Sequence, residues 1–194
     1  MTGHHDHEAQ SAAARARRLE ERLITAGLTS DDEIDEFLTG LSVGASLVNG
    51  ARMAARAWTD PRYRALLLDD GNAAAAELGF GPFSYQLRVV ANDENTHNVI
   101  VCTLCSCYPV SLLGPSPGWY KSFAYRSRTV REPRAVLAEF GVTVPDEVQI
   151  SVWDSTSEAR YMVLPRRPGG TGGLAAGELT ALVTRNGLIG TALL

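Results

Sequence analysis

Three cysteines lie within six consecutive residues of this chain, at Cys102, Cys105 and Cys107, and the sequence holds no others. A C-x-x-C-x-C spacing brings the three sulfurs around one centre, and thiolates prefer soft or borderline metal ions. So short a loop also places the peptide nitrogens of Ser106 and Cys107 against a bound ion. If both peptide nitrogens bind the ion as deprotonated amides, one coordination position of the ion stays open. This arrangement favours a strongly polarising ion such as trivalent cobalt or iron. The candidate metal ligands are therefore Cys102, Cys105, Ser106 and Cys107.

Other interpretations of the cysteines remain open on spacing alone. A structural zinc would use the three sulfurs with His97 as a fourth ligand, although structural zinc sites usually draw ligands from two separate loops. The two cysteines of a C-x-C pair are also too close together to fill two ligand positions of a tetrahedral zinc site comfortably. A thioredoxin-type redox pair would need a βαβ context that the sequence lacks, and the odd number of cysteines disfavours a secreted disulfide framework.

The composition narrows the class of protein. The chain has 194 residues, of which 45% are hydrophobic and 21% charged, which suits one large domain or a domain with an extension. A net charge of −4 disfavours a nucleic-acid surface. No apolar run approaches the roughly 20 residues of a membrane span, and the N-terminus lacks the layout of a signal peptide. We therefore expect a cytoplasmic protein without nucleic-acid or membrane partners.

The elements that position the loop fall into two parts. Residues 1–40 are expected to form an N-terminal extension with a polar start, a helix over 11–26 that ends at Gly27, and a short helix from a capping box at Ser30 to Leu38. Residues 41–194 are expected to form one domain with the metal loop where a strand leaves the sheet. The fold class is α+β (layered α/β), with a helical N-terminal arm and an α/β C-terminal domain.

The periodicity of apolar residues and the turn signals predict the elements of the second part. The expected helices cover residues 43–58, 61–70, 72–79, 119–128, 133–140 and 176–185. The expected strands cover residues 85–90, 98–102, 148–153, 160–164 and 188–193, and the third and fourth of these are expected to pair with each other.

Further sequence motifs lie on both sides of the loop. The loop reads Val101-Cys102-Thr103-Leu104-Cys105-Ser106-Cys107-Tyr108-Pro109. The other segments are Ala57-Trp58-Thr59-Asp60-Pro61, Glu77-Leu78-Gly79, Leu113-Gly114, Trp119-Tyr120-Lys121, Tyr125-Arg126-Ser127-Arg128, Pro133-Arg134, Val136–Gly141, Val152-Trp153-Asp154, Glu158–Pro165 and Leu188-Ile189-Gly190. Over about residues 40–194 the chain resembles nitrile hydratase α subunits and the related thiocyanate hydrolase γ subunit.

The resemblance implies a role for each residue of the loop. Cys102 is the unmodified axial thiolate, whereas Cys105 is oxidised to a sulfinate and Cys107 to a sulfenate. Ser106 and Cys107 supply backbone amide nitrogens, and the Ser106 hydroxyl orients the oxidised sulfurs. Thr103 is typical of cobalt-type members, where iron-type members usually carry Ser, so Co³⁺ is expected rather than iron. Cys105, Ser106 and Cys107 are the implied catalytic residues.

The implied reaction is the hydration of a nitrile to the primary amide. The metal is a Lewis acid that polarises the nitrile or activates water, and the sulfenate oxygen of Cys107 is the other candidate nucleophile. Two other hypotheses compete with nitrile hydration. Thiocyanate hydrolysis uses the same loop, and a non-catalytic zinc-binding or maturation protein would hold zinc on three unoxidised thiols.

The resemblance also implies partners. Oxidised sulfurs add negative charge to the loop, and in the family arginines of a β subunit pair with it. We therefore expect one or more β-type subunits, together with a metallochaperone or activator. Within this chain, Arg126, Arg128 and Arg160 are candidates for ordering the loop or the interface. The alternative for each is a solvated arginine or a structural ion pair.

The sequence departs from the family immediately after the loop. Val110-Ser111 stands where the family usually has Trp-Pro, which predicts a roomier pocket and a bulkier nitrile unless a partner subunit fills the space. Residues 88–97 also drift from the family pattern, so no substrate contacts are transferred there. These departures suggest a specialised branch, such as the three-subunit toyocamycin nitrile hydratase, whose substrate is a cyano-substituted nucleoside.

A histidine cluster lies near the N-terminus at His4, His5 and His7. If the initiator Met is removed, Thr2-Gly3-His4 forms a nitrogen-rich copper or nickel motif. The alternative is a disordered polar tail. Truncation of residues 1–10 with metal loading unchanged would exclude a role in metal delivery.

Overall fold

The computed structural model describes residues 18–30, 32–33 and 45–194, and the chain divides into two compact units, Met1–Gly44 and Ala45–Leu194. In the first unit, residues 18–25 are helical and Gly27 follows at a φ of +66°. Ser30 and Glu33 form the predicted capping box, because each side chain accepts a hydrogen bond from the backbone N–H of the other. The predicted helix start at residue 11, most of the helix up to Leu38 and the histidine cluster lie outside the described residues.

Several helices of the second unit begin at a side-chain cap. Ser46 caps α3 (Leu47–Thr59), and Asp60 followed by Pro61 caps α4 (Pro61–Asp69). The others are α5 (Gly71–Ala76), α6 (Val110–Leu113), a 3-10 helix η1 (Gly118–Lys121), α7 (Phe123–Thr129), α8 (Pro133–Glu139), α9 (Ala176–Leu182) and α10 (Arg185–Ile189). The predicted helix over 119–128 is thus split, because the Ser122 side chain caps α7 and starts a new helix there.

The strands form two parallel pairs, and neither is the pair that the sequence predicts. They are β1 (Gln86–Ala91), β2 (Thr96–Val101), β3 (Gln149–Asp154) and β4 (Ala159–Leu164). β1 pairs with β4 and β2 pairs with β3, so the predicted pairing of β3 with β4 is wrong. Local patterns identify strands but do not choose partners, which depend on packing over long sequence separations.

Asparagine side chains separate β1 from β2. The Asn92 carboxamide oxygen accepts from the Asn98 backbone N–H at 2.7 Å, and the Asn98 carboxamide donates to the Ala91 carbonyl at 2.8 Å. Side chains therefore satisfy backbone groups that a β1–β2 ladder would otherwise use.

The C-terminal segment corrects another prediction. The strand expected at residues 188–193 is absent there, and α10 ends at Gly190 with a φ of +92°. A Cβ atom at Gly190 would lie 2.0 Å from the Asn98 carbonyl oxygen. Only glycine permits both the left-handed turn and this close approach, which brings α10 against β2.

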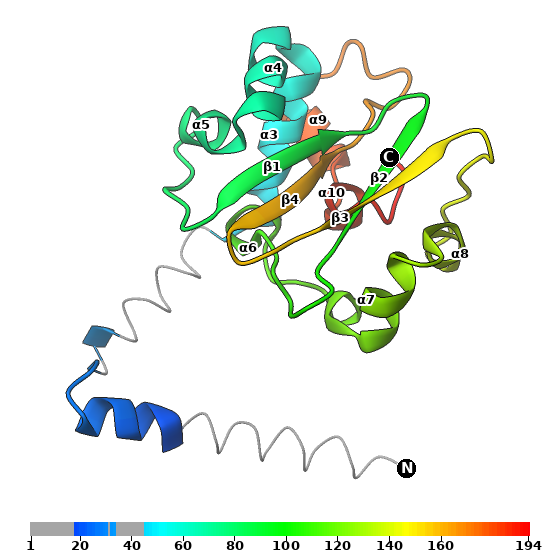
Figure 1. Ribbon diagram of the computed structural model, residues 1–194. Coiled ribbons are helices and arrows are strands. Elements are labelled where there is room, and N and C mark those ends of the chain that lie inside the picture. Colours follow the sequence, from blue (N-terminus) through cyan, green and yellow to red (C-terminus); the bar gives the residue numbers. More distant parts are fainter. Residues whose placement is uncertain (1–17, 31, 34–44) are drawn as a thin grey trace. The chain divides into compact units, whose positions relative to one another are not determined.

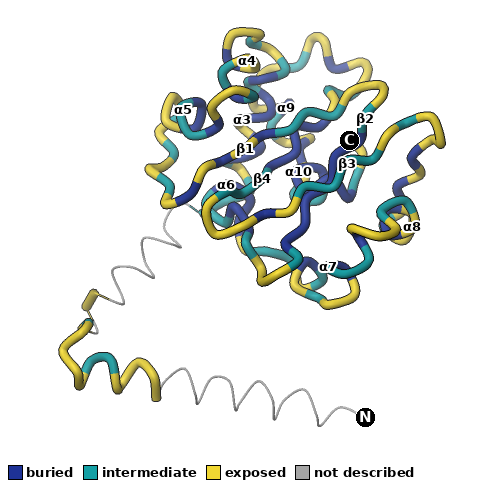
Figure 2. Tube along the Cα trace, in the orientation of Figure 1, coloured by how far each residue is buried: buried dark blue, intermediate teal, exposed yellow. Residues whose placement is uncertain are grey.

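Helices cover both strand pairs (Figure 1). α4 and α5 contact β1, α10 contacts β4, and α7 and α8 contact β2 and β3 respectively. Figure 2 shows buried residues along β2, in the second half of β4 and on helices that cover the strands, whereas β3 has none. The largest fully buried side chains are Tyr63, Tyr120, Met53, Leu67, Leu87, Ile100, Leu112, Leu113, Leu137, Met162, Leu164 and Leu179. None of the described helices is long and apolar enough to cross a membrane.

Candidate metal centre

The three cysteines meet directly after the end of β2. The sulfurs of Cys102 and Cys105 are 3.4 Å apart, those of Cys105 and Cys107 are 3.2 Å apart, and all three lie within 4.8 Å of one another. Cys102 is buried, Cys105 is exposed and Cys107 is half-buried, and none is in a disulfide. Over the described part of the chain, no other cluster of His, Cys, Asp or Glu side chains offers such a donor set.

Hydrogen bonds from neighbouring elements hold the backbone carbonyls of the loop. From α7, the Arg126 guanidinium donates to the Cys102 carbonyl at 3.0 Å and to the Thr103 carbonyl at 2.7 Å. From η1, the buried Tyr120 hydroxyl donates to the Cys107 carbonyl at 3.0 Å. With these carbonyls bound by the surrounding protein, the loop stays in one conformation without help from a regular ladder.

A further set of contacts fixes the ends of the loop. Asp154, at the end of β3, accepts hydrogen bonds from both the backbone N–H and the hydroxyl of Thr103. At the other end, the Arg160 guanidinium donates to the Tyr108 carbonyl at 2.7 Å. Parallel pairing of β2 with β3 aligns Val101 with Asp154, and this register brings the carboxylate to the first turn of the loop.

Backbone N–H groups face the sulfurs, as the loop length predicts. The Cys105 N–H donates to the Cys102 sulfur at 3.3 Å. The pKa of Cys105 is lowered to about 7, first by hydrogen bonds from the Cys107 and Cys102 side chains and then by the N–H groups of Cys107 and Ser106. Burial raises the pKa of Cys107 to about 12, and the hydrogen bond to Cys105 adds to the rise. Cys105 therefore ionises at lower pH than Cys107, beside the two amides that the metal interpretation requires.

The arrangement fits a metal ion bound by three sulfurs and two amide nitrogens. Three sulfurs on one short loop match a soft or borderline ion. The N–H groups of Ser106 and Cys107 lie at the Cys105 sulfur, so the same loop can present both donor types. All four predicted ligand residues are thus together, although their oxidation and their catalytic roles stay predictions.

The structure does not bring His97 to the sulfurs. His97 lies near the start of β2, and its Nε2 is 2.8 Å from the Gly190 carbonyl oxygen. Cys102 follows the other end of the strand, and at about 3.3 Å per residue the two are about 16 Å apart along it. His97 is therefore no fourth zinc ligand, and burial, which lowers its pKa, keeps the ring neutral.

The three candidate arginines have different roles. Arg126 and Arg160 bind loop carbonyls and so order the loop, as expected. Arg128 on α7 instead forms ion pairs with Glu132, just before α8, at 2.5 Å and with Glu139 on α8 at 2.6 Å. For Arg128 the alternative of a structural ion pair is confirmed.

Two residues that hold the loop, Tyr120 and Asp154, are not among the site residues that the sequence patterns predict. Both belong to motifs that resemble the family, but a motif alone does not show which loop atom a side chain reaches. Trp119 and Tyr125 pack edge-on at 4.8 Å, and the Tyr125 hydroxyl donates to the Ile100 carbonyl at 2.7 Å. Tyr120 and Tyr125 of this aromatic group are buried, and their hydroxyls bind carbonyls of the loop and of β2.

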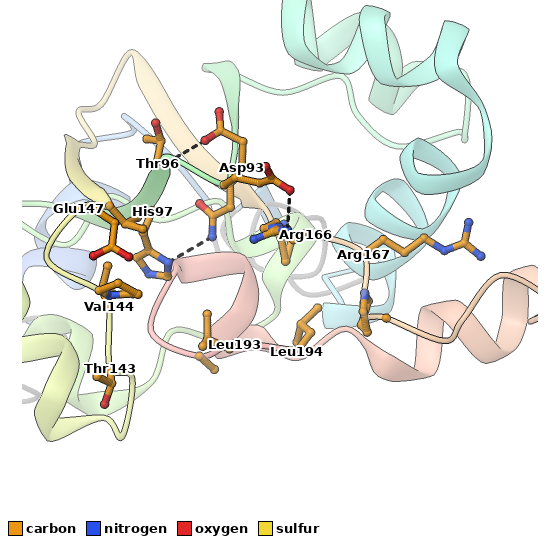
Figure 3. Close-up of a pocket in the computed structure, with 18 residues that line it drawn as sticks. Asp93, Thr96, His97, Thr143, Val144, Glu147, Arg166, Arg167, Leu193 and Leu194 are labelled. Atoms are coloured by element: carbon orange, nitrogen blue, oxygen red, sulfur yellow. Dashed lines mark hydrogen bonds and ion pairs between the residues drawn. The ribbon is translucent and has the colours of Figure 1, made fainter.

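Two pockets lie at opposite ends of β2. A pocket of about 340 Å³ includes Ser106 of the loop and also Val110. The larger one, of about 490 Å³, contains His97 and Asp93 at the start of β2 (Figure 3). The larger pocket lies away from the sulfurs, so size does not identify the reactive site here.

The fold and the loop together define a class: an α+β protein that presents three sulfurs and inward-facing amides as a candidate metal centre. The chain belongs to the nitrile hydratase α-chain family, because the family model "Nitrile hydratase, alpha chain" matches residues 10–192. The resemblance inferred from the motifs is therefore confirmed.

Individual relatives agree with this assignment. The chain is 47% identical over 179 residues to the α subunit of the high-molecular-weight cobalt-containing nitrile hydratase of Rhodococcus rhodochrous, covering 91% of this chain and 88% of that one. It is 49% identical over 154 residues to the thiocyanate hydrolase γ subunit of Thiobacillus thioparus, covering 73% and 63%. A solved Fe-type nitrile hydratase double mutant from Comamonas testosteroni Ni1 superposes with a TM-score of 0.86 at 40% identity, covering 95% of this chain and 91% of that one. This likeness confirms the predicted α+β fold class.

Proposed function

We propose that this chain is the metal-bearing α subunit of a nitrile hydratase and takes part in hydrating a nitrile to the primary amide at trivalent cobalt. The observation that carries the proposal is the single loop on which three sulfurs lie within 4.8 Å of one another. The 47% identity to a cobalt-containing relative supports cobalt, and Thr103 agrees with it. Iron is the less favoured ion, although an Fe-type relative has the same fold.

Each loop residue has a defined part in this proposal. The sulfurs of Cys102, Cys105 and Cys107 and the amide nitrogens of Ser106 and Cys107 would hold the ion. Bound there, cobalt would supply a Lewis acid that makes the nitrile carbon electrophilic. Tyr120 and Arg126 keep the loop carbonyls in place, and this preserves the inward direction of the amides.

We propose further that Cys105 carries a sulfinate and Cys107 a sulfenate, and that a β-type subunit covers them. Cys105 is exposed, and the neighbouring Leu104 is 86% exposed although it is apolar. Phe123, at the start of α7, is 81% exposed. An open apolar face beside anionic sulfurs fits a partner that brings both apolar contacts and arginines.

Metal analysis combined with intact mass tests the centre. For the assembled protein we expect one cobalt per chain and about three added oxygens, two on a sulfinate and one on a sulfenate. Cys107→Ser is expected to remove the sulfenate oxygen, and peptide mapping would locate it. Zinc on three unoxidised thiols would overturn the proposal in favour of a non-catalytic metal-binding protein.

The substrate is proposed to be a bulky nitrile, such as a heteroaromatic nitrile of the toyocamycin kind. Val110 lines the pocket of about 340 Å³ that includes Ser106, and a Trp there would occupy part of this space. The test is a series of nitriles of rising size on the assembled enzyme. If bulky aromatic nitriles have no advantage, a partner side chain fills the gap and the size proposal fails.

Thiocyanate hydrolysis is the second candidate, favoured by the 49% identity to a thiocyanate hydrolase γ subunit. Product analysis separates the two, because nitrile hydration gives an amide and thiocyanate hydrolysis gives carbonyl sulfide. Carbonyl sulfide from thiocyanate, without amide from any nitrile, would replace the leading proposal.

The remaining proposals concern organisation and place. Residues 1–40 would be an extension to an α-like domain over 41–194, a separate activator would load the metal, and the protein would reside in the cytoplasm. Limited proteolysis, metal loading with and without co-expressed partners, and cell fractionation test these points in turn.

A further inference from the structure

The pocket beside the loop has an unusual lining. It is formed by Ser106, Tyr108, Val110, Pro115, Ser116, Lys121 and Arg160. Two of these side chains are cationic and none is acidic. The pocket is therefore positive, although the loop that borders it would carry anionic sulfurs once oxidised.

Lys121 is the cation in this lining that remains available. It ends η1, its side chain is exposed, and among the described residues it has no hydrogen-bond or ion-pair partner for its ammonium group. Arg160, by contrast, donates to the Tyr108 carbonyl at 2.7 Å and lies over the Tyr85 ring at 4.3 Å. Arg160 thus contributes charge from a fixed position, whereas Lys121 can move to meet a ligand.

Tyr120 fixes the backbone position of Lys121. Tyr120, the preceding residue, is fully buried and bonded to the Cys107 carbonyl, so the same short helix holds the loop and carries the lysine. Ser106 contributes to the pocket from the loop itself. A molecule with its reacting group at the loop could therefore extend a second group into the pocket.

We propose that this pocket is a subsite for nitriles that carry an anionic oxygen substituent, and that Lys121 is the residue that selects them. The inference rests on the proposed function and narrows its bulky nitriles to anionic ones, in place of neutral ones of the toyocamycin kind. A carboxylate in the pocket would be paired with Lys121 and would lie in the field of Arg160, with no described carboxylate in the lining to compete. The pairing would also offset repulsion from the oxidised sulfurs. One partly exposed ion pair supports about a fivefold preference.

The test uses cobalt-loaded protein assembled with its partner subunit and three substrates of similar size. These are 3-cyanobenzoate, its neutral near-isostere 3-cyanobenzamide, and 3-cyanobenzyl alcohol. We expect kcat/KM to favour the anion about fivefold over both neutral nitriles, and the preference to fall as salt screens the pair. Equal rates, or preference for the alcohol, would overturn the inference.

Variants separate Lys121 from general charge effects. Lys121→Met is expected to abolish the preference and Lys121→Arg to keep it. Arg131→Met is the matched control, because it removes the same net charge from an exposed residue outside the pocket lining. If Arg131→Met abolishes the preference equally, long-range steering explains it and Lys121 selects nothing.

Binding provides a readout that does not depend on turnover. In titration calorimetry, 3-carboxybenzamide, the expected product, should bind about fivefold more tightly to the wild-type assembly than to Lys121→Met. Equal binding to both proteins would refute the subsite. Failure of the inference is distinct from failure of the proposed function, because hydration of 3-cyanobenzamide without anion preference would leave the latter intact.

Discussion

Replacing Tyr120 by Phe tests whether the hydroxyl beneath the loop holds Cys107 in place. Tyr120 is fully buried, and its hydroxyl donates a 3.0 Å hydrogen bond to the Cys107 carbonyl. Burial raises the pKa of Tyr120 far above its ordinary value, so the hydroxyl keeps its proton at every working pH. Phe retains the ring and its edge contacts with Tyr108 and Trp119. The substitution therefore removes a hydroxyl and little else.

The magnitude follows from the bond that is lost. One neutral hydrogen bond contributes about 1 kcal/mol, and leaving the carbonyl short of a partner raises the cost to about 2 kcal/mol. The melting temperature should fall by about 4–8 °C. If the loss is local to the loop, the open population rises about 30-fold.

Tyr63→Phe is the matched control for this experiment. The Tyr63 hydroxyl is also fully buried and donates at 3.0 Å to a carbonyl, that of Ala74, on helices away from the loop. Both variants should lose similar thermal stability. Only Tyr120→Phe should speed hydrogen exchange of the amides at residues 103–107 in the metal-free protein, and only Tyr120→Phe should speed the loss of cobalt from the loaded protein to a chelator. Unchanged exchange in Tyr120→Phe, or equal cobalt loss in both variants, would refute the role assigned to Tyr120.

Three further predictions concern titration, packing and surface charge. In the metal-free protein, the rate of Cys105 alkylation should rise through a pH of about 7, and Cys105 should react before Cys107. The reason is that the lowered pKa of Cys105 gives thiolate at lower pH. Peptide mapping that finds Cys107 modified first would contradict this. Gly190→Ala should destabilise the fold by about 3 kcal/mol or more, because the new methyl group would clash with the Asn98 carbonyl and the φ of this residue is positive. Denaturant unfolding measures the free energy of unfolding. A loss under about 1 kcal/mol would contradict this prediction. Arg128→Met should lower the free energy of unfolding by under about 1 kcal/mol and leave the cobalt content unchanged, because the ion pairs of Arg128 are on the surface. A lower cobalt content in the purified variant would show a role at the loop.

Local signals predicted those features that depend on neighbouring residues. The Asp60-Pro61 start of α4 and the Ser30–Glu33 capping box are set by contacts within a few residues, and both are confirmed. Pairing partners were mispredicted, because β1 and β4 meet across about 70 residues of chain and nothing local specifies that contact. The prediction of a strand at residues 188–193 is wrong for a similar reason. Leu188 and Ile189 are apolar residues that also suit a strand, but the Thr184 cap and packing make them helical.

The sequence by itself determined the candidate donor set of this protein. Three sulfurs and two amides within six residues must be close together in almost any conformation, because the covalent chain joins them. Only the tertiary structure decided what holds that loop: Arg126, Tyr120 and Asp154 reach it from three different elements. It also decided that His97 lies away from the sulfurs and that Lys121 lines the adjoining pocket. These placements depend on strand register and helix packing, which arise from contacts between residues far apart in the chain.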